Sequence, residues 1–146
     1  MPELLVVLVV ISVLLVATFF VLRPNDRAAE RNDAARWIDL VQMTRALDLY
    51  YHDHNSLPAD MPTTDQIIGT EDGNYNLCKV LVPTYWKDLP FDPQYGIKSV
   101  ADGTCNATDQ QYLTAYSIRR NKAGDSVTLT APFADVTKDL TLTKHF

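Results

Sequence analysis

An uninterrupted apolar segment opens the chain. Every residue from Leu4 to Leu22 is apolar except Ser12 and Thr18, and a carboxylate, Glu3, stands directly before it. About twenty such residues in a helix span a bilayer core of roughly 30 Å. An unpaired carboxylate in hydrocarbon costs about 2–3 kcal/mol or more, and the segment contains no cation. Residues 1–24 are therefore expected to form a membrane or filament-core helix whose Glu3 is paired by another chain.

The pattern changes to alternating charge after this segment. Opposite charges stand three apart at Arg27/Glu30 and Asp33/Arg36, a spacing that weakly supports a solvated helix. An apolar stripe with three-four spacing then consists of Trp37, Leu40, Val41, Thr44, Leu47 and Tyr51, with Met43 and Tyr50 at its edge. We expect one continuous helix from Pro2 to about His54, about 80 Å long, whose residues 25–54 lie on a globular head.

The head is expected to comprise residues 55–146. The segment 55–62 breaks the helix, and residues 77–93 are typical of a short helix followed by a proline-stiffened connection. Alternating residues predict strands at 112–119 and 126–131 around a turn at 121–125, with a third strand at 139–143. The fold class is therefore α+β: a long N-terminal helix packed on a small C-terminal antiparallel sheet.

The chain contains two cysteines, Cys78 and Cys105. An even count in a chain that leaves the cytoplasm favours a single disulfide, and two free buried thiols are the alternative. Closing a loop of this size would stabilise the head by about 3–4 kcal/mol.

Two segments carry a resemblance to a known family. The sequence Pro2-Glu3-Leu4-Leu5-Val6-Val7-Leu8 resembles the N-terminus of type IV pilins and pseudopilins, and Leu77 to Pro93, with its Leu-Pro-x-Asp-Pro, resembles their heads. In that family a basic leader ending in Gly is cleaved, the new N-terminal aromatic residue is methylated, and a Glu at the fifth mature position pairs with a neighbour's terminal amine. The resemblance thus assigns this pairing to Glu3.

The chain departs from the family pattern at three places. Glu3 is two residues too close to the start, so we expect the mature N-terminus two residues before Met1. Ser12 stands where the family often has Gly, and Phe20 where it often has Pro. Because Pro24 is the nearby proline, we expect a helix kink between Phe20 and Pro24.

The resemblance implies a structural role as the major pilin of a type IV pilus. The residues expected to carry subunit assembly are Glu3, Leu4, Leu5, Val6, Val7, Leu8, Ile11, Leu15, Phe19 and Phe20. The implied partners are other copies of the chain in a helical extracellular filament, a prepilin peptidase and an assembly platform, with an inner-membrane pool before assembly. Arg23-Pro24-Asn25-Asp26 and Leu47-Asp48-Leu49-Tyr50 resemble the major pseudopilins of type II secretion, which is one alternative. A monomeric membrane-anchored binding module is the other.

The remaining polar motifs favour neither an enzyme nor a cofactor. His52 and His54 stand two apart on a helix and point to different sides, so they are expected to meet the last carbonyls rather than a metal. Residues 71–74 lack the ligand spacing of a calcium loop and predict a solvated turn. Residues 106–108 fit a glycosylation sequon. The basic cluster 119–122 is interpreted as a solvated hairpin tip, because the net charge of −5 opposes nucleic-acid binding.

Overall fold

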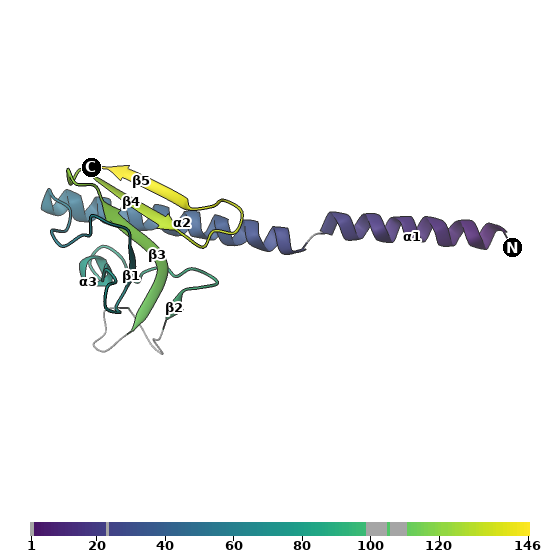
Figure 1. Cartoon of the computed structure of the whole chain (residues 1–146), viewed down its shortest axis with the longest axis horizontal. Helices are drawn as coiled ribbons and strands as arrows, with labels where there is room; N and C mark the ends of the chain where they lie inside the picture. Colours follow the sequence, from purple (N-terminus) through teal and green to yellow (C-terminus); the bar gives the residue numbers. More distant parts are fainter. Residues whose placement is uncertain (1, 23, 99–104, 106–110) are drawn as a thin grey trace.

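The structure, a computed structural model, describes residues 2–22, 24–98, 105 and 111–146. In chain order the elements are α1 (Pro2–Leu22), α2 (Pro24–His54), β1 (Gln66–Gly69), α3 (Cys78–Leu81), β2 (Ile97–Lys98), β3 (Tyr112–Arg120), β4 (Ser126–Ala131) and β5 (Leu140–His145). The fold is α+β, as the sequence predicts. Figure 1 shows α2 lying along the sheet, while α1 projects beyond the head and carries the N-terminus far from it.

The predicted helix from Pro2 to His54 is described as two helices. The first ends at Leu22 and the second begins at Pro24, inside the range where the proline was expected to disturb the helix. Proline is well tolerated at the first position of a helix, because the backbone N–H that it lacks would have no partner there. Arg23 lies outside the described residues, so the kink at Pro24 stays a prediction.

The face of α2 that packs on the head differs from the predicted stripe. Its fully buried line is spaced three and four residues apart and consists of Asp33, Arg36, Leu40, Met43 and Leu47. Trp37, predicted to begin the stripe, is 43% exposed. The buried Leu40 and Leu47 confirm part of the stripe, but its start at Trp37 was wrong because Asp33 and Arg36 were interpreted as solvated. Including this ion pair rotates the buried face toward Met43 and away from Trp37.

The sheet is antiparallel, and β3 is its central strand. β3 pairs with β1, β2 and β4, and β4 pairs in turn with β5 at the edge. Strands β3, β4 and β5 confirm the three predicted strands, and the β3–β4 turn lies at the predicted residues. β1 and β2 were not predicted, because strands of four and two residues are too short to show an alternating pattern.

A bulge interrupts β3 at Ala115. This residue has φ of 63°, in the left-handed region that L residues rarely adopt, and the register of the β1–β3 pair shifts beside it. The hydroxyl of Thr114 donates to the Ile68 carbonyl at 3.0 Å and accepts the N–H of Tyr116 at 3.2 Å. The Thr114 carbonyl accepts the N–H of Asp92 at 3.0 Å. The bulge therefore holds the segment that contains Asp92 against the sheet.

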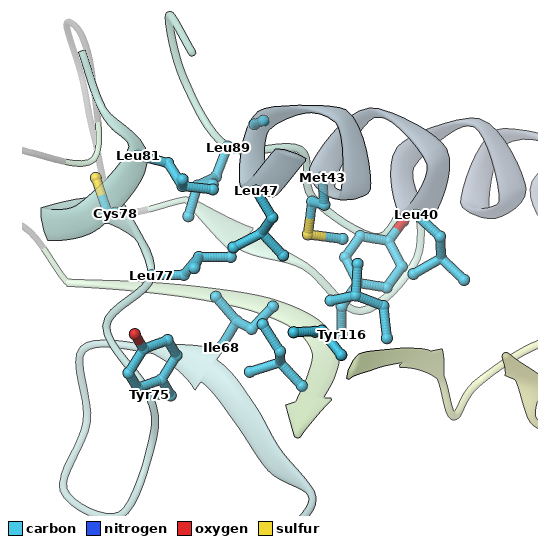
Figure 2. Packing of buried hydrophobic residues seen from close by; sticks show 14 of the residues in the cluster. Leu40, Met43, Leu47, Ile68, Tyr75, Leu77, Cys78, Leu81, Leu89 and Tyr116 are labelled. Carbon is cyan, nitrogen blue, oxygen red and sulfur yellow. The ribbon is translucent and has the colours of Figure 1, made fainter. Parts of the chain in front are cut away.

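The hydrophobic core lies between α2, α3 and the sheet. Figure 2 shows side chains of α2 pointing toward those of the sheet and of the segment around α3; the buried residues it labels include Leu40, Met43, Leu47, Ile68, Leu77, Leu81 and Tyr116. Burying a leucine or isoleucine side chain contributes about 1.5–3 kcal/mol. The C-terminal half of α2 is thus an integral part of the head.

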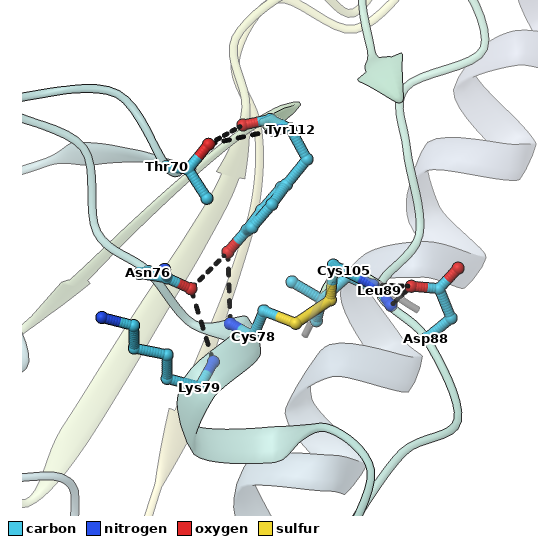
Figure 3. The surroundings of a disulfide bond; sticks show 8 residues. All are labelled: Thr70, Asn76, Cys78, Lys79, Asp88, Leu89, Cys105 and Tyr112. Atoms are coloured by element: carbon cyan, nitrogen blue, oxygen red, sulfur yellow. Dashed lines mark hydrogen bonds between the residues drawn. A yellow bond between two sulfur atoms is a disulfide. The ribbon is translucent and has the colours of Figure 1, made fainter. Parts of the chain in front are cut away.

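The predicted disulfide between Cys78 and Cys105 is present, with Cα atoms 6.0 Å apart (Figure 3). Both cysteines are buried. The N–H of Cys78 donates to the hydroxyl oxygen of Tyr112 at 3.2 Å, and that hydroxyl donates to Asn76 at 2.9 Å. The N–H of Cys105 donates to the Asp88 carboxylate at 3.2 Å. The bond therefore ties α3 to a residue 27 positions later in the chain.

Candidate assembly site

Helix α1 leaves its apolar side chains uncovered on all sides. Every residue from Pro2 to Thr18 is exposed, and the large apolar side chains among them are between 48% (Ile11) and 66% (Leu5) exposed. The expected assembly residues with described side chains are all in this set: Glu3, Leu4, Leu5, Val6, Val7, Leu8, Ile11 and Leu15. Phe19 and Phe20 lie in the helix, but their side chains are not described. Nothing in the described head covers this surface.

The hydroxyl groups of α1 are satisfied within the helix. Ser12 donates to the carbonyl of Leu8 at 2.7 Å, and Thr18 donates to the carbonyl of Leu14 at 2.6 Å. Both hydroxyl donors of α1 are therefore satisfied by the helix's own carbonyls. Glu3 has no hydrogen-bond or ion-pair partner among the described residues. Among the residues whose side chains the structure describes, which in α1 end at Thr18, no helix is long and apolar enough to cross a membrane.

The buried guanidinium of Arg36 connects α2 to two segments of the head. The side chain is 0% exposed. Its Nε and Nη2 donate to the two carboxylate oxygens of Asp92 at 2.7 and 3.3 Å, and Nη2 also donates to Gln94 at 2.6 Å. Its Nη1 donates to Asp33 at 2.8 Å and to Asp135 at 3.1 Å. We call these five residues the Arg36 network.

Asp33 holds the β4–β5 connection on α2. Its carboxylate accepts three successive backbone N–H groups, from Asp135 at 2.9 Å, Val136 at 2.9 Å and Thr137 at 3.0 Å. Burial by itself raises the pKa of this carboxyl group, but the three amides and Arg36 outweigh it and lower the pKa to about 2. The carboxylate is therefore charged at neutral pH.

Asp92, in the Leu-Pro-x-Asp-Pro motif, holds the connection before β2. Besides Arg36, its carboxylate accepts the N–H groups of Gln94 and Tyr95, both at 2.9 Å. Burial opposes ionisation, yet the bonds from Arg36 and these amides lower the pKa of Asp92. The motif thus has a physical role here, because its aspartate is the main anionic partner of the buried arginine.

The Arg36 network contains more negative than positive charge, and hydrogen bonds stabilise its carboxylates. Three carboxylates, those of Asp33, Asp92 and Asp135, surround one guanidinium, a formal sum of −2. Burial lowers the pKa of Arg36, but its bonds to these carboxylates outweigh this and raise it. In the described part of the chain no buried side-chain nitrogen or oxygen lacks a partner. A fully satisfied charged cluster of this kind fixes one arrangement of helix and head.

Four exposed apolar side chains stand close in the sequence to Gln94 and Asp135 of the network. They are Tyr95, Ile97, Phe133 and Val136, and we call them the base surface. The rings of Tyr95 and Phe133 are 4.7 Å apart between centroids. Each residue stands within three positions of Gln94 or Asp135 in the sequence, so the network determines where these side chains are presented.

The sequence missed the Arg36 network, although it contained a signal for it. Asp33 and Arg36 continue the three-four spacing of Leu40, Met43 and Leu47 toward the N-terminus. Their partners come from positions near 92 and 135, which no local pattern connects to α2. The position of the Asp33/Arg36 pair in line with this apolar stripe is therefore the observation that could have indicated that the pair is buried.

Within the described residues, the other polar motifs do not form a catalytic arrangement. The Nδ1 of His54 lies 3.0 Å from the carbonyl of Tyr50, as expected for a histidine at a helix end, whereas the Nδ1 of His52 lies 3.5 Å from the Asp53 carboxylate instead of a carbonyl. Its ring stacks on that of Tyr50, with centroids 4.1 Å apart. Residues 71–74 form an exposed turn closed by the bond from the Asn74 N–H to the Glu71 carbonyl. Among the described residues no group of His, Cys, Asp or Glu could hold a metal ion. The sequon at 106–108 lies outside the described residues.

Comparison with known proteins gives no match from which a family could be assigned. No protein-family model, curated protein or solved structure matches the sequence or the fold.

Proposed function

We propose that the chain is a non-enzymatic structural subunit, the major pilin, of a helical filament of the type IV pilus class. The observation that carries the proposal is α1, whose apolar side chains are exposed on every side and whose first turn contains the single carboxylate Glu3. A helix that is apolar all round requires an apolar environment. Other copies of α1 would supply that environment in the filament, and the inner membrane would supply it before assembly.

Assembly in this scheme exchanges one apolar environment for another. Transfer of α1 from lipid to a bundle of identical helices gains little hydrophobic free energy, because acyl chains are already apolar. Close packing, contacts between heads and the Glu3 ion pair must then decide which subunits join and in what register. The Glu3 partner would be the N-terminal amine of a neighbouring copy, as the family resemblance implies.

The head contributes to assembly through its firm attachment to the helix. Arg36 and Asp33 fix the β4–β5 connection and the segment before β2 to α2, so the head cannot rotate freely about its helix. The base surface would then meet a neighbouring head in a constant orientation. The disulfide adds stability of about 3–4 kcal/mol, which suits a filament exposed outside the cell.

The proposal is tested by replacing Glu3. We expect Glu3→Ala to leave insertion into the membrane fraction intact and to reduce the yield of sheared filaments by about tenfold or more, since the lost pair is worth about 2–3 kcal/mol. The matched control is Glu30→Ala, which removes one exposed carboxylate from α2. Filament yield is measured by electron microscopy and immunoblotting of sheared cell-surface material. Abundant filaments from the Glu3 variant would refute the pairing role.

The N-terminal peptide of the native protein separates the proposal from its alternatives. A methylated N-terminus two residues before Met1, found in sheared surface filaments, supports a major pilin. The same processed end found only in the inner membrane supports a type II secretion pseudopilin, the second candidate, which the similarity of residues 23–26 and 47–50 to that group favours. An unprocessed Met1 identifies a membrane-anchored binding module and overturns the filament.

A further inference from the structure

A basic hollow lies at the end of the head opposite to α1. It has a volume of about 280 Å³ and is lined by Thr63, Arg119, Arg120, Asn121, Lys122 and Thr128. Figure 1 shows that the β3–β4 turn is at the end of the sheet that carries the C-terminus, far from the projecting helix. The N–H of Phe146 donates to the Asp125 carbonyl at 2.9 Å, which confirms this proximity. The hollow is therefore separate from the proposed assembly surface.

The three cations of this hollow are only partly neutralised by the protein. Arg119 forms an exposed ion pair with Asp65 at 3.2 Å through its Nε, which leaves its terminal nitrogens available. Neither Arg120 nor Lys122 has an ion-pair partner among the described residues. The whole chain carries a net charge of −5. Three cations around one hollow in an acidic protein create a local positive potential that attracts an anion.

The backbone around the hollow is firmly held. The side-chain oxygen of Asn121 accepts the N–H groups of Gly124 at 2.8 Å, Asp125 at 3.1 Å and Ser126 at 3.3 Å. Gly124 has φ of 80°, a conformation that glycine adopts without strain. The N–H of Arg120 donates to the carbonyl of Pro62 at 2.8 Å, which fixes the adjacent segment with Thr63. The backbone positions from which the cations of the hollow extend are therefore fixed.

From these observations we propose that the hollow binds a phosphate-type oxyanion. Arg119, Arg120 and Lys122 supply the positive charge, and the hydroxyl of Thr63 supplies a neutral donor, while the hydroxyl of Thr128 on the same wall is paired with that of Thr143 at 3.1 Å. Guanidinium groups bind phosphate oxygens through paired N–H donors, and the ammonium of lysine acts as a point charge. The volume suits one phosphate group, either as free phosphate or as one phosphodiester of a single-stranded nucleic acid. This site does not depend on the proposed filament, because it belongs to a single head.

The test uses the full chain, labelled with ¹⁵N and held in micelles of a non-ionic detergent. Sodium phosphate and a single-stranded oligonucleotide of about twelve nucleotides are titrated separately, with sodium chloride of equal ionic strength as the reference. Backbone amide shifts of residues 119–122 report binding. The double variant Arg120→Gln/Lys122→Gln is compared with Lys79→Gln/Lys87→Gln, which removes the same charge from two exposed lysines elsewhere.

We expect saturable shifts at residues 119–122 and a loss of affinity of about tenfold in the Arg120/Lys122 variant. The control should stay within about twofold of the unmodified chain. Equal affinity per phosphate for both probes identifies a free-phosphate site, and much tighter binding of the oligonucleotide identifies a nucleic-acid phosphodiester. Shifts that chloride reproduces, an absence of saturable shifts, or equal losses in both double variants would overturn the proposal.

Discussion

Replacing Arg36 by alanine should weaken the attachment of the head to α2 more than any change at an exposed charge of that helix. The substitution leaves the buried carboxylates of Asp33 and Asp92 without their cation, and breaking a buried ion pair typically costs about 3–5 kcal/mol. In the variant Asp33 keeps three backbone N–H donors and Asp92 keeps two. We therefore expect a loss of stability near the lower end of this range, about 3 kcal/mol. This is a large part of a typical stability of about 5–15 kcal/mol.

The loss can be measured by urea and thermal unfolding of the full chain in detergent micelles, followed by tryptophan fluorescence. For a domain of about one hundred residues, about 3 kcal/mol corresponds to a Tm lowered by about 12 °C or more. Arg36→Lys keeps the charge but not the planar fork that binds Asp92, so we expect an intermediate loss of about 1–2 kcal/mol. Arg31→Ala, at an exposed position of α2, is the control and should change stability by less than about 0.5 kcal/mol. If Arg36→Ala behaved like this control, the network would contribute nothing to stability.

Three further changes test other parts of the structure. Because the pKa of Asp33 falls from 3.8 to about 2 on folding, its contribution to stability is complete only above about pH 5 and is lost progressively as the pH falls through 3.8 to about 2. Asp33→Asn should flatten this part of the stability profile, and an unchanged profile would contradict the assignment. Ala115→Val should destabilise the head by about 2–4 kcal/mol, since a β-branched side chain is strained at φ of 63°. Ala115→Gly should leave the stability nearly unchanged, because relief of about 1 kcal/mol of backbone strain offsets the lost burial of a methyl group. If Ala115→Val and Ala115→Gly changed the stability equally, the result would argue against the bulge. Replacing both Cys78 and Cys105 by serine should cost about 3–4 kcal/mol in urea unfolding, and reduction of the unmodified chain should reproduce the loss.

Part of the head was predictable because its patterns are local. Polar and apolar residues alternate over all six positions of β4, over the first four of β5 and over Tyr116–Arg119 of β3, and the turn at 121–125 contains Asn and Gly. The disulfide followed from a count of two cysteines. The short strands β1 and β2 could not be predicted, since they become strands only by pairing with β3.

The same distinction between local patterns and long-range contacts applies to the candidate sites. The apolar character of α1 and the isolation of Glu3 can be stated from the chain alone, because hydrophobicity and charge belong to the residues themselves. The predicted stripe of α2 contained Leu40 and Leu47 of the buried line but began at the exposed Trp37 rather than at Asp33 and Arg36, because the local pattern offered no reason to bury an ion pair. The basic residues 119–122 were recognised as a cluster, but only the fold places Thr63 and Thr128 beside them.

The sequence by itself therefore determined the apolar first helix, the α+β class, the main strands and the disulfide, all of which depend on residue type and short-range spacing. The tertiary structure decided which face of α2 is buried and what the Leu-Pro-x-Asp-Pro motif does. A buried arginine is tolerated only where several acceptors converge on it, and those of Arg36 come from positions 56 to 99 residues away as well as from its own helix. Contacts between residues so distant in the chain arise only when the bulge in β3 and the β4–β5 connection have brought the segments together.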